Sequence, residues 1–137
     1  MEIENTGYGT SFSEYGRSVN SSLFETDLPS LIEKMKNSNS WKRGEIISRV
    51  LLNSPDRQIL LTALHENTEI NSFQRSDSVT FRIVEGKIYF RTRKESAILD
   101  EGQVMTLHEH IDYSLITREE TVLLLTLEND ARLEVKT

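Results

Sequence analysis

Cysteine is absent from this chain of 137 residues, which excludes disulfides, zinc sites built from thiolates and cysteine nucleophiles. Long apolar runs are missing too, since none approaches the roughly 18 residues of a membrane-spanning helix. Basic residues do not outnumber acidic ones, and a formal net charge of −6 argues against binding to nucleic-acid phosphates. The polar N-terminus lacks the basic region and apolar stretch of a signal peptide. We therefore expect a cytoplasmic protein that binds neither membranes nor nucleic acids.

The length suits one domain with one core. Residues 1–24 are polar and show no sustained periodicity, so we expect an irregular or flexible N-terminal arm. Residues 25–137 are expected to form the domain, which begins with a helix over 27–37. Asp27 suits the N-cap of this helix, Pro29 suits its first turn, and apolar residues follow at helical spacing.

From Glu45 onward, short apolar segments alternate with turn signals. The expected strands are EIISRVLL, RQILLTALH, SVTFRIV, KIYFRT, SAIL, QVMTL, YSLIT, TVLLLTL and RLEVK. Glu85-Gly86 between SVTFRIV and KIYFRT predicts a hairpin. Many short strands at near-regular spacing indicate an all-β sandwich or barrel, and we expect Trp41 to close one end of it.

Two glycines organise the middle of the chain. Gly86 follows a strand-like run, and Gly102 opens a second unit, GQVMTLHEHIDYSLIT. Together with NSFQR before them, these units resemble the paired motifs of small single-domain cupins of the RmlC-like type. The resemblance covers about residues 40–127. It implies an all-β fold, a cupin-type jelly-roll barrel preceded by the short N-terminal helix.

The resemblance also locates the positions at which cupin enzymes hold Fe, Mn, Ni or Zn, with three histidines and one glutamate. Counted from Gly86 and Gly102, these positions carry Phe73, Arg75, Val79 and Tyr113. Phenylalanine and valine offer no ligand atom, and the fixed charge of arginine repels a cation. The resemblance therefore implies the fold but predicts no metal ligand, no catalytic residue and no cofactor.

Side chains alternate between the two faces of a strand. The resemblance to cupins implies that the side chain at position 79 points into the barrel. Phe81 and Ile83 should then also face the interior, and Thr80 and Arg82 should face outward. This assignment gives the barrel an apolar interior.

The interior suggests a ligand pocket. Arginine can clamp a carboxylate through two hydrogen bonds, and a tyrosine hydroxyl can orient a polar group. A pocket lined by Phe73, Arg75, Phe81 and Tyr113 would suit a small organic acid. In the alternative interpretation, Arg75 pairs with Asp77 in solvent.

His108 and His110 form an H-x-H pair, which in an extended chain places both imidazoles on one side. With His65 at a strand end, they could form a rearranged metal site, and the chain would then be a metal-dependent cupin enzyme of the dioxygenase or isomerase class. The other interpretation is a polar surface loop. We likewise expect the basic cluster Arg91, Arg93 and Lys94 to be a solvated hairpin end.

The function predicted from these residues is that of a non-enzymatic, metal-free cupin-like protein that binds a small organic ligand. Two strands, ILLTAL and VLLLTL, are apolar on both faces and need cover on the outside. We expect the N-terminal helix to cover one and a second subunit to cover the other, which predicts a homodimer. A third interpretation is an effector-binding regulatory module that acts with a partner protein.

Overall fold

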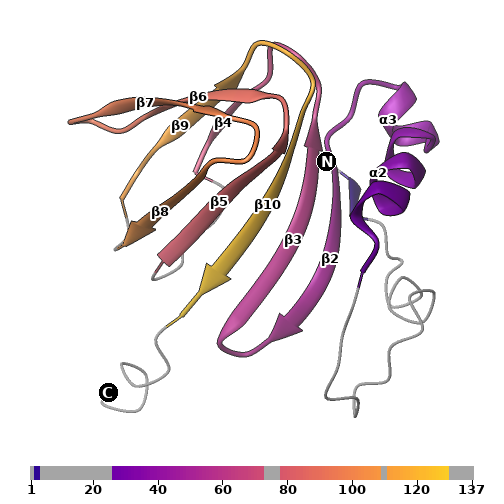
Figure 1. The fold of residues 1–137 in the computed structure, drawn as a ribbon, viewed down its shortest axis with the longest axis horizontal. Coiled ribbons are helices and arrows are strands. Elements are labelled where there is room, and N and C mark those ends of the chain that lie inside the picture. The colour runs from indigo at the N-terminus through magenta and orange to yellow at the C-terminus, as the bar shows by residue number, and fades with distance from the viewer. Residues whose placement is uncertain (1, 4–25, 73–77, 109–110, 130–137) are drawn as a thin grey trace.

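The structure, a computed structural model, consists of two β-sheets with two helices beside the larger sheet (Figure 1). It describes residues 2–3, 26–72, 78–108 and 111–129. The strands are β1 (Glu2–Ile3), β2 (Ile47–Ser54), β3 (Arg57–Leu64), β4 (Glu69–Asn71), β5 (Ser78–Glu85), β6 (Lys87–Arg91), β7 (Ser96–Asp100), β8 (Val104–His108), β9 (Ser114–Thr117) and β10 (Thr121–Glu128). The six-stranded sheet has the order β1-β2-β3-β10-β5-β8, and the four-stranded sheet has the order β4-β9-β6-β7. The expected all-β architecture is confirmed.

The helical segment contains two helices where the sequence predicts one. In α2 (Leu28–Lys36), the Asp27 side chain accepts a hydrogen bond from the Ser30 backbone N–H, as predicted for the N-cap. A second helix, α3 (Asn39–Lys42), follows after only two residues. Its N-cap is Ser38, whose Oγ accepts from the Trp41 N–H at 3.2 Å. The residues directly after the predicted helix therefore start a second one.

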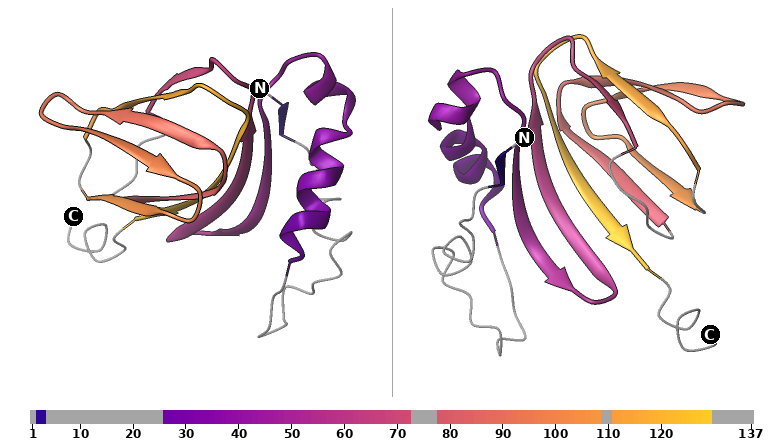
Figure 2. Two further views of the ribbon diagram at one scale, coloured as in Figure 1. Left: turned by 45° about the horizontal axis from the view of Figure 1, so that its top comes forward. Right: turned by 180° about the vertical axis from the view of Figure 1, so that it is seen from behind.

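The helices cover the outer face of the six-stranded sheet on its β2 and β3 side (Figure 2). The buried residues of this layer are Leu31, Met35, Trp41, Ile47, Leu51, Leu61, Ala63 and Val122. Because Leu61 and Ala63 belong to β3 and Val122 belongs to β10, the helices cover both strands that are apolar on two faces. The second subunit expected over one of these strands is not needed for that purpose.

Trp41 belongs to this helix layer, so the prediction that it closes the barrel end is wrong. Its side chain is 7 % exposed and packs with the residues between the helices and the sheet. The indole ring stacks on the imidazole of His65, with ring centroids 3.5 Å apart. The tryptophan therefore fixes α3 against the end of β3.

The barrel interior lies between the two sheets and follows the predicted alternation. Val79, Phe81 and Ile83 of β5 are buried in the larger core cluster, whereas Arg82 between them is exposed. The same cluster contains residues of both sheets: Leu64, Ile88, Phe90, Leu99, Tyr113, Leu115, Leu123, Leu125 and Leu127. The predicted inward face of β5 is confirmed.

Gly86 and Gly102 mark the points at which the chain passes from one sheet to the other. The predicted hairpin at Gly86 is wrong, because β5 pairs with β8 and β10, whereas β6 pairs with β7 and β9. The chain thus leaves the larger sheet at Gly86 (φ +98°) and returns to it at Gly102 (φ +88°). The two crossings are neighbours, since the Gly102 N–H donates to the Ile83 carbonyl at 2.8 Å.

Lys36, the last residue of α2, joins this helix to both neighbouring strand ends. Its Nζ contacts the carboxylate of Glu85, and it lies 3.3 Å from Glu120 Oε1. Partial burial by itself lowers the pKa of Lys36, but the hydrogen bonds and charges of Glu85 and then Glu120 outweigh it. The pKa is therefore raised above the ordinary value of 10.5.

Within residues 1–25 the structure describes β1, where Glu2 and Ile3 pair in parallel with Ile47 and Ser48. The irregular or flexible arm over residues 1–24 stays a prediction. Residues 4–25 and the predicted last strand, RLEVK, lie outside the described residues. None of the helices that the structure describes has the length and apolar character needed to cross a bilayer.

Candidate functional site

Three aromatic rings occupy the barrel interior next to the predicted pocket. Phe81 and Tyr113 meet edge to face with centroids 5.4 Å apart, and Phe90 lies 5.6 Å from Phe81 and 5.3 Å from Tyr113. Such geometries are favourable for aromatic pairs and add to the stabilisation from burial. The side chains of Phe81, Phe90 and Tyr113 are 0 %, 4 % and 6 % exposed. These rings therefore pack as core.

The structure brings together two of the four predicted pocket residues. Phe81 and Tyr113 are in contact, whereas Phe73 and Arg75 lie outside the described residues. Phe81 is fully enclosed, so of the two only Tyr113 reaches a surface depression.

The described positions at which a cupin would hold its metal do not fit one. Val79 is buried among apolar neighbours, and Tyr113 stacks on Phe90 instead of standing beside other ligand atoms. In the part of the chain that the structure describes, no group of three or more His, Asp or Glu side chains is placed to hold a metal ion. No chemical step is therefore assigned to a metal at these positions.

Tyr113 lies at the start of β9 and is fixed by Ser72 at the end of β4. The Ser72 N–H donates to the Tyr113 carbonyl at 2.9 Å, and the Tyr113 N–H donates back to Ser72 Oγ at 3.1 Å. The two strands are thereby joined beyond their last ladder pair, Asn71 with Ser114. This link fixes Tyr113, whose ring packs in the core against Phe81 and Phe90.

A groove of about 490 Å³, here called the end groove, opens at that place. Its polar lining comes from the ends of β4 and β6 and the start of β9, and includes Asn71, Ser72, Arg91, Arg93, Asp112 and Tyr113. Among the described residues, neither Arg91 nor Arg93 lies within ion-pair distance of a carboxylate. The groove thus presents two guanidinium groups that have no ion-pair partner within the described part of the chain.

The basic cluster was identified from the sequence, but the groove that Arg91 and Arg93 line was not. The chain does turn there between β6 and β7, where the Thr92 N–H donates to the Glu95 carbonyl at 2.8 Å. Arg91 is the last residue of β6 and pairs with Ser114 of β9, which brings it beside Tyr113. Alternation along β6 could have placed Arg91 on the outer face, but only the pairing with β9 shows what lies next to it.

The two histidines that the structure describes lie far apart. His108 ends β8 opposite Ser78, which in turn pairs with Glu128 at the end of β10. His65 follows Leu64, which pairs with Thr121 at the start of β10. His65 and His108 therefore lie at opposite ends of the larger sheet, and His65 cannot complete a site with His108. His110 lies outside the described residues.

Comparison with known proteins rests on structure alone, because the sequence matches no family model and no curated protein. A cupin superfamily protein of Desulfitobacterium hafniense superposes with a TM-score of 0.62 at 16% identity, over 83% of this chain and 97% of that one. An RmlC-like cupin of Shewanella frigidimarina gives 0.56 at 15% identity, over 64% of this chain and 78% of that one. The fold is that of a cupin.

A third similar structure is a conserved protein of unknown function from Streptococcus pyogenes, with a TM-score of 0.58 and 22% identity over 64% of this chain and 77% of that one. The predicted cupin-type jelly roll is confirmed, and identities this low establish the fold only. Asn67, in the turn between β3 and β4, has a φ of +60°, which asparagine adopts with less strain than most residues.

Proposed function

We propose that this cupin is a metal-free, non-enzymatic binding protein whose ligand is a small organic acid held in the end groove. The observation that carries the proposal is the pair Arg91 and Arg93, which flank Tyr113 without ion-pair partners among the described residues. A guanidinium can hold a carboxylate through two parallel hydrogen bonds, and such charge-assisted bonds are about twice as strong as neutral ones.

The rest of the groove supports the same class of ligand. Its volume of about 490 Å³ lies within the range of roughly 300–1,000 Å³ that small-molecule sites occupy. Asn71 and Ser72 add polar groups that can orient a hydroxyl or a second carboxylate. A hydroxy acid or a dicarboxylic acid combines these features.

The proposal that the barrel works without a metal rests on the side chains that replace the ligands. Val79 and Tyr113 are built into the core, and replacing a ligand by a packed apolar group removes a donor atom while stabilising the fold. The alternative, a metal-dependent enzyme that uses His108 and His110, predicts about one equivalent of bound metal. Elemental analysis after dialysis against Fe, Mn, Ni or Zn tests it, and a ratio near one that drops when both histidines become alanine would refute the metal-free proposal.

The homodimer and the cytoplasmic location are also proposals. Because the helices cover β3 and β10, a second subunit would have to use another surface. The outer side of β8, where Val104 is 57% exposed beside Thr106 and Arg82, is a candidate. Sedimentation equilibrium should give twice the chain mass of 15.8 kDa. The Val104→Asp variant should then give the mass of one chain.

The ligand proposal is tested by isothermal titration calorimetry with a set of monocarboxylic, dicarboxylic, hydroxy and amino acids. We expect Arg91→Gln and Arg93→Gln each to weaken binding about tenfold or more, because each removes one charge-assisted pair. Arg82→Gln is the matched control, since Arg82 is also exposed on a strand but faces away from the groove. If no acid binds at millimolar concentration, or if Arg82→Gln weakens binding as much as the groove variants do, the proposal is wrong.

A further inference from the structure

The outer face of the four-stranded sheet carries a second depression, the outer groove, of about 510 Å³. Side chains that point away from the barrel line it, since Ile88 and Phe90 of β6 are buried inside while Tyr89 and Arg91 face outward. Tyr89 pairs with Ile98 of β7 on one side and with Ile116 of β9 on the other. These three side chains form an apolar floor, and Ile98 is 57% exposed.

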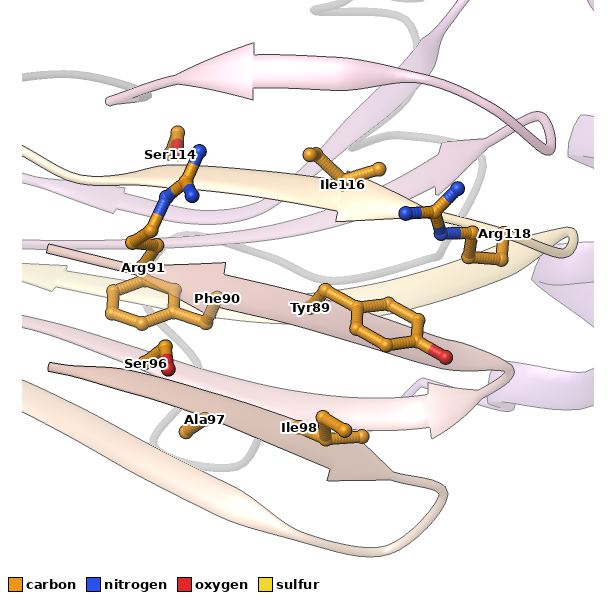
Figure 3. A pocket seen from close by; sticks show the side chains of 9 residues that line it. All are labelled: Tyr89, Phe90, Arg91, Ser96, Ala97, Ile98, Ser114, Ile116 and Arg118. Atoms are coloured by element: carbon orange, nitrogen blue, oxygen red, sulfur yellow. The ribbon is translucent and has the colours of Figure 1, made fainter.

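Arginines stand at both ends of this floor. Figure 3 shows Arg91 at one end beside Ser114 and Arg118 at the other, with Ile116 between them. The guanidinium carbon of Arg118 lies 5.3 Å from the centre of the Tyr89 ring, which holds the charge above the floor. Neither arginine has an ion-pair partner among the described residues.

The carboxylates on the strands of the four-stranded sheet form no ion pair with these two arginines. Asp100 pairs with Lys87, whose Nζ lies 3.4 Å from its carboxylate. Glu69 of β4 pairs across the ladder with Ile116 and shares its outward face, but it does not line the groove and forms no ion pair with Arg118. In a chain with a net charge of −6, the outer groove is thus a local basic site.

The spacing of the two arginines points to an extended ligand. Arg91 pairs with Ser114, and Arg118 lies four residues further along the same segment, so the two positions are about 13 Å apart at the rise of a strand. Acidic residues four apart in an extended peptide have the same separation, with an apolar side chain between them over Ile116. We propose that the outer groove binds an extended acidic segment of another protein, with one carboxylate on Arg91 and the other on Arg118.

Two other occupants fit less well. A small acid is too short to reach both arginines, whose positions are about 13 Å apart. A second copy related by a two-fold axis would bring this groove against its own copy and set arginine against arginine, which is repulsive. An acidic segment matches the charge, the length and the apolar floor together.

The probe is a fluorescein-labelled peptide with two aspartates four residues apart, a valine midway and threonine elsewhere, and its binding to the full chain is followed by fluorescence anisotropy. We expect binding that weakens with salt, and a loss of about tenfold in Arg118→Gln, because one charge-assisted pair is removed. Glu69→Gln should strengthen binding, because it removes a negative charge from the outward face that Glu69 shares with Ile116. A gain in affinity cannot come from misfolding, so this variant keeps the test meaningful if Arg118→Gln is unstable.

Arg93→Gln separates this proposal from the end groove, because Arg93 lines only that groove. It should weaken binding of the small acid and leave the peptide unaffected, whereas Arg118→Gln should do the reverse. A peptide with lysines in place of the aspartates should not bind. The proposal is overturned if the aspartate peptide fails to bind at millimolar concentration, if the lysine peptide binds equally well, or if neither Arg118→Gln nor Glu69→Gln changes its affinity.

Discussion

Gly86 should be far less tolerant of alanine than Gly102, although both have positive φ and both lie where the chain changes sheets. At Gly86 (φ +98°) an added Cβ would lie 2.5 Å from the Glu120 carbonyl oxygen and 2.7 Å from Thr121 Cα, whereas at Gly102 (φ +88°) it would meet no atom within 4 Å. The two substitutions therefore share the backbone strain and differ in the steric contact.

The expected costs follow from these two contributions. Positive φ costs a residue with a Cβ about 1–2 kcal/mol, and this is the whole expected effect of Gly102→Ala. Overpacking against atoms that cannot rotate away adds about 1–3 kcal/mol. Gly86→Ala should therefore lower the free energy of unfolding by about 2–5 kcal/mol.

Urea unfolding followed by Trp41 fluorescence measures both variants, since Trp41 is the one tryptophan of the chain and is buried between helix and sheet. The slope of the free energy against urea should stay unchanged, so that the midpoint alone reports stability. If both alanine substitutions lower the free energy of unfolding equally, the steric contact inferred at Gly86 is refuted.

Three further substitutions test other contacts. Lys36→Gln should lower the free energy of unfolding by about 1 kcal/mol near neutral pH, whereas the exposed Lys34→Gln should not. Because the pKa of Lys36 is raised above 10.5 by Glu85 and Glu120, its contribution is complete below that value, and the difference from wild type should close as the pH rises through the raised pKa. Phe81→Ala should cost about 3–5 kcal/mol in urea unfolding, because its side chain is 0% exposed, and a cost below about 1 kcal/mol would mean that the interior is loosely packed. Asp27→Ala should cost about 1 kcal/mol by loss of the N-cap, and an unchanged thermal midpoint would contradict that role.

The fold was predictable where local rules and the spacing of the motifs agree. The inward face of β5 follows from the two-residue period of a strand, and the Asp27 cap follows from side-chain chemistry within one turn. The hairpin at Gly86 was predicted wrongly because a turn signal shows that the chain bends, not which strands then pair. That choice depends on β10 and β9, which come more than twenty-five residues later.

The candidate sites were harder to predict for the same reason. Tyr113 was identified from the spacing of the cupin motif, but the identity of its neighbours depends on the pairing of β6 with β9. Arg118 gave no signal in the sequence, because its position above Tyr89 depends on that same pairing. Trp41 was misplaced because α3 is a four-residue helix whose formation depends on packing against β3.

The position of β10 has a consequence for how the protein is made. The last strand of the described chain lies in the middle of the larger sheet, between β3 and β5. Until the ribosome has released residues 121–128, β3 and β5 each expose an unpaired edge, and the apolar side chains of β10 are absent from both core clusters. A nascent chain stalled before Thr121 is therefore expected to be sensitive to protease and to bind chaperones, and to become resistant only after β10 has emerged from the exit tunnel.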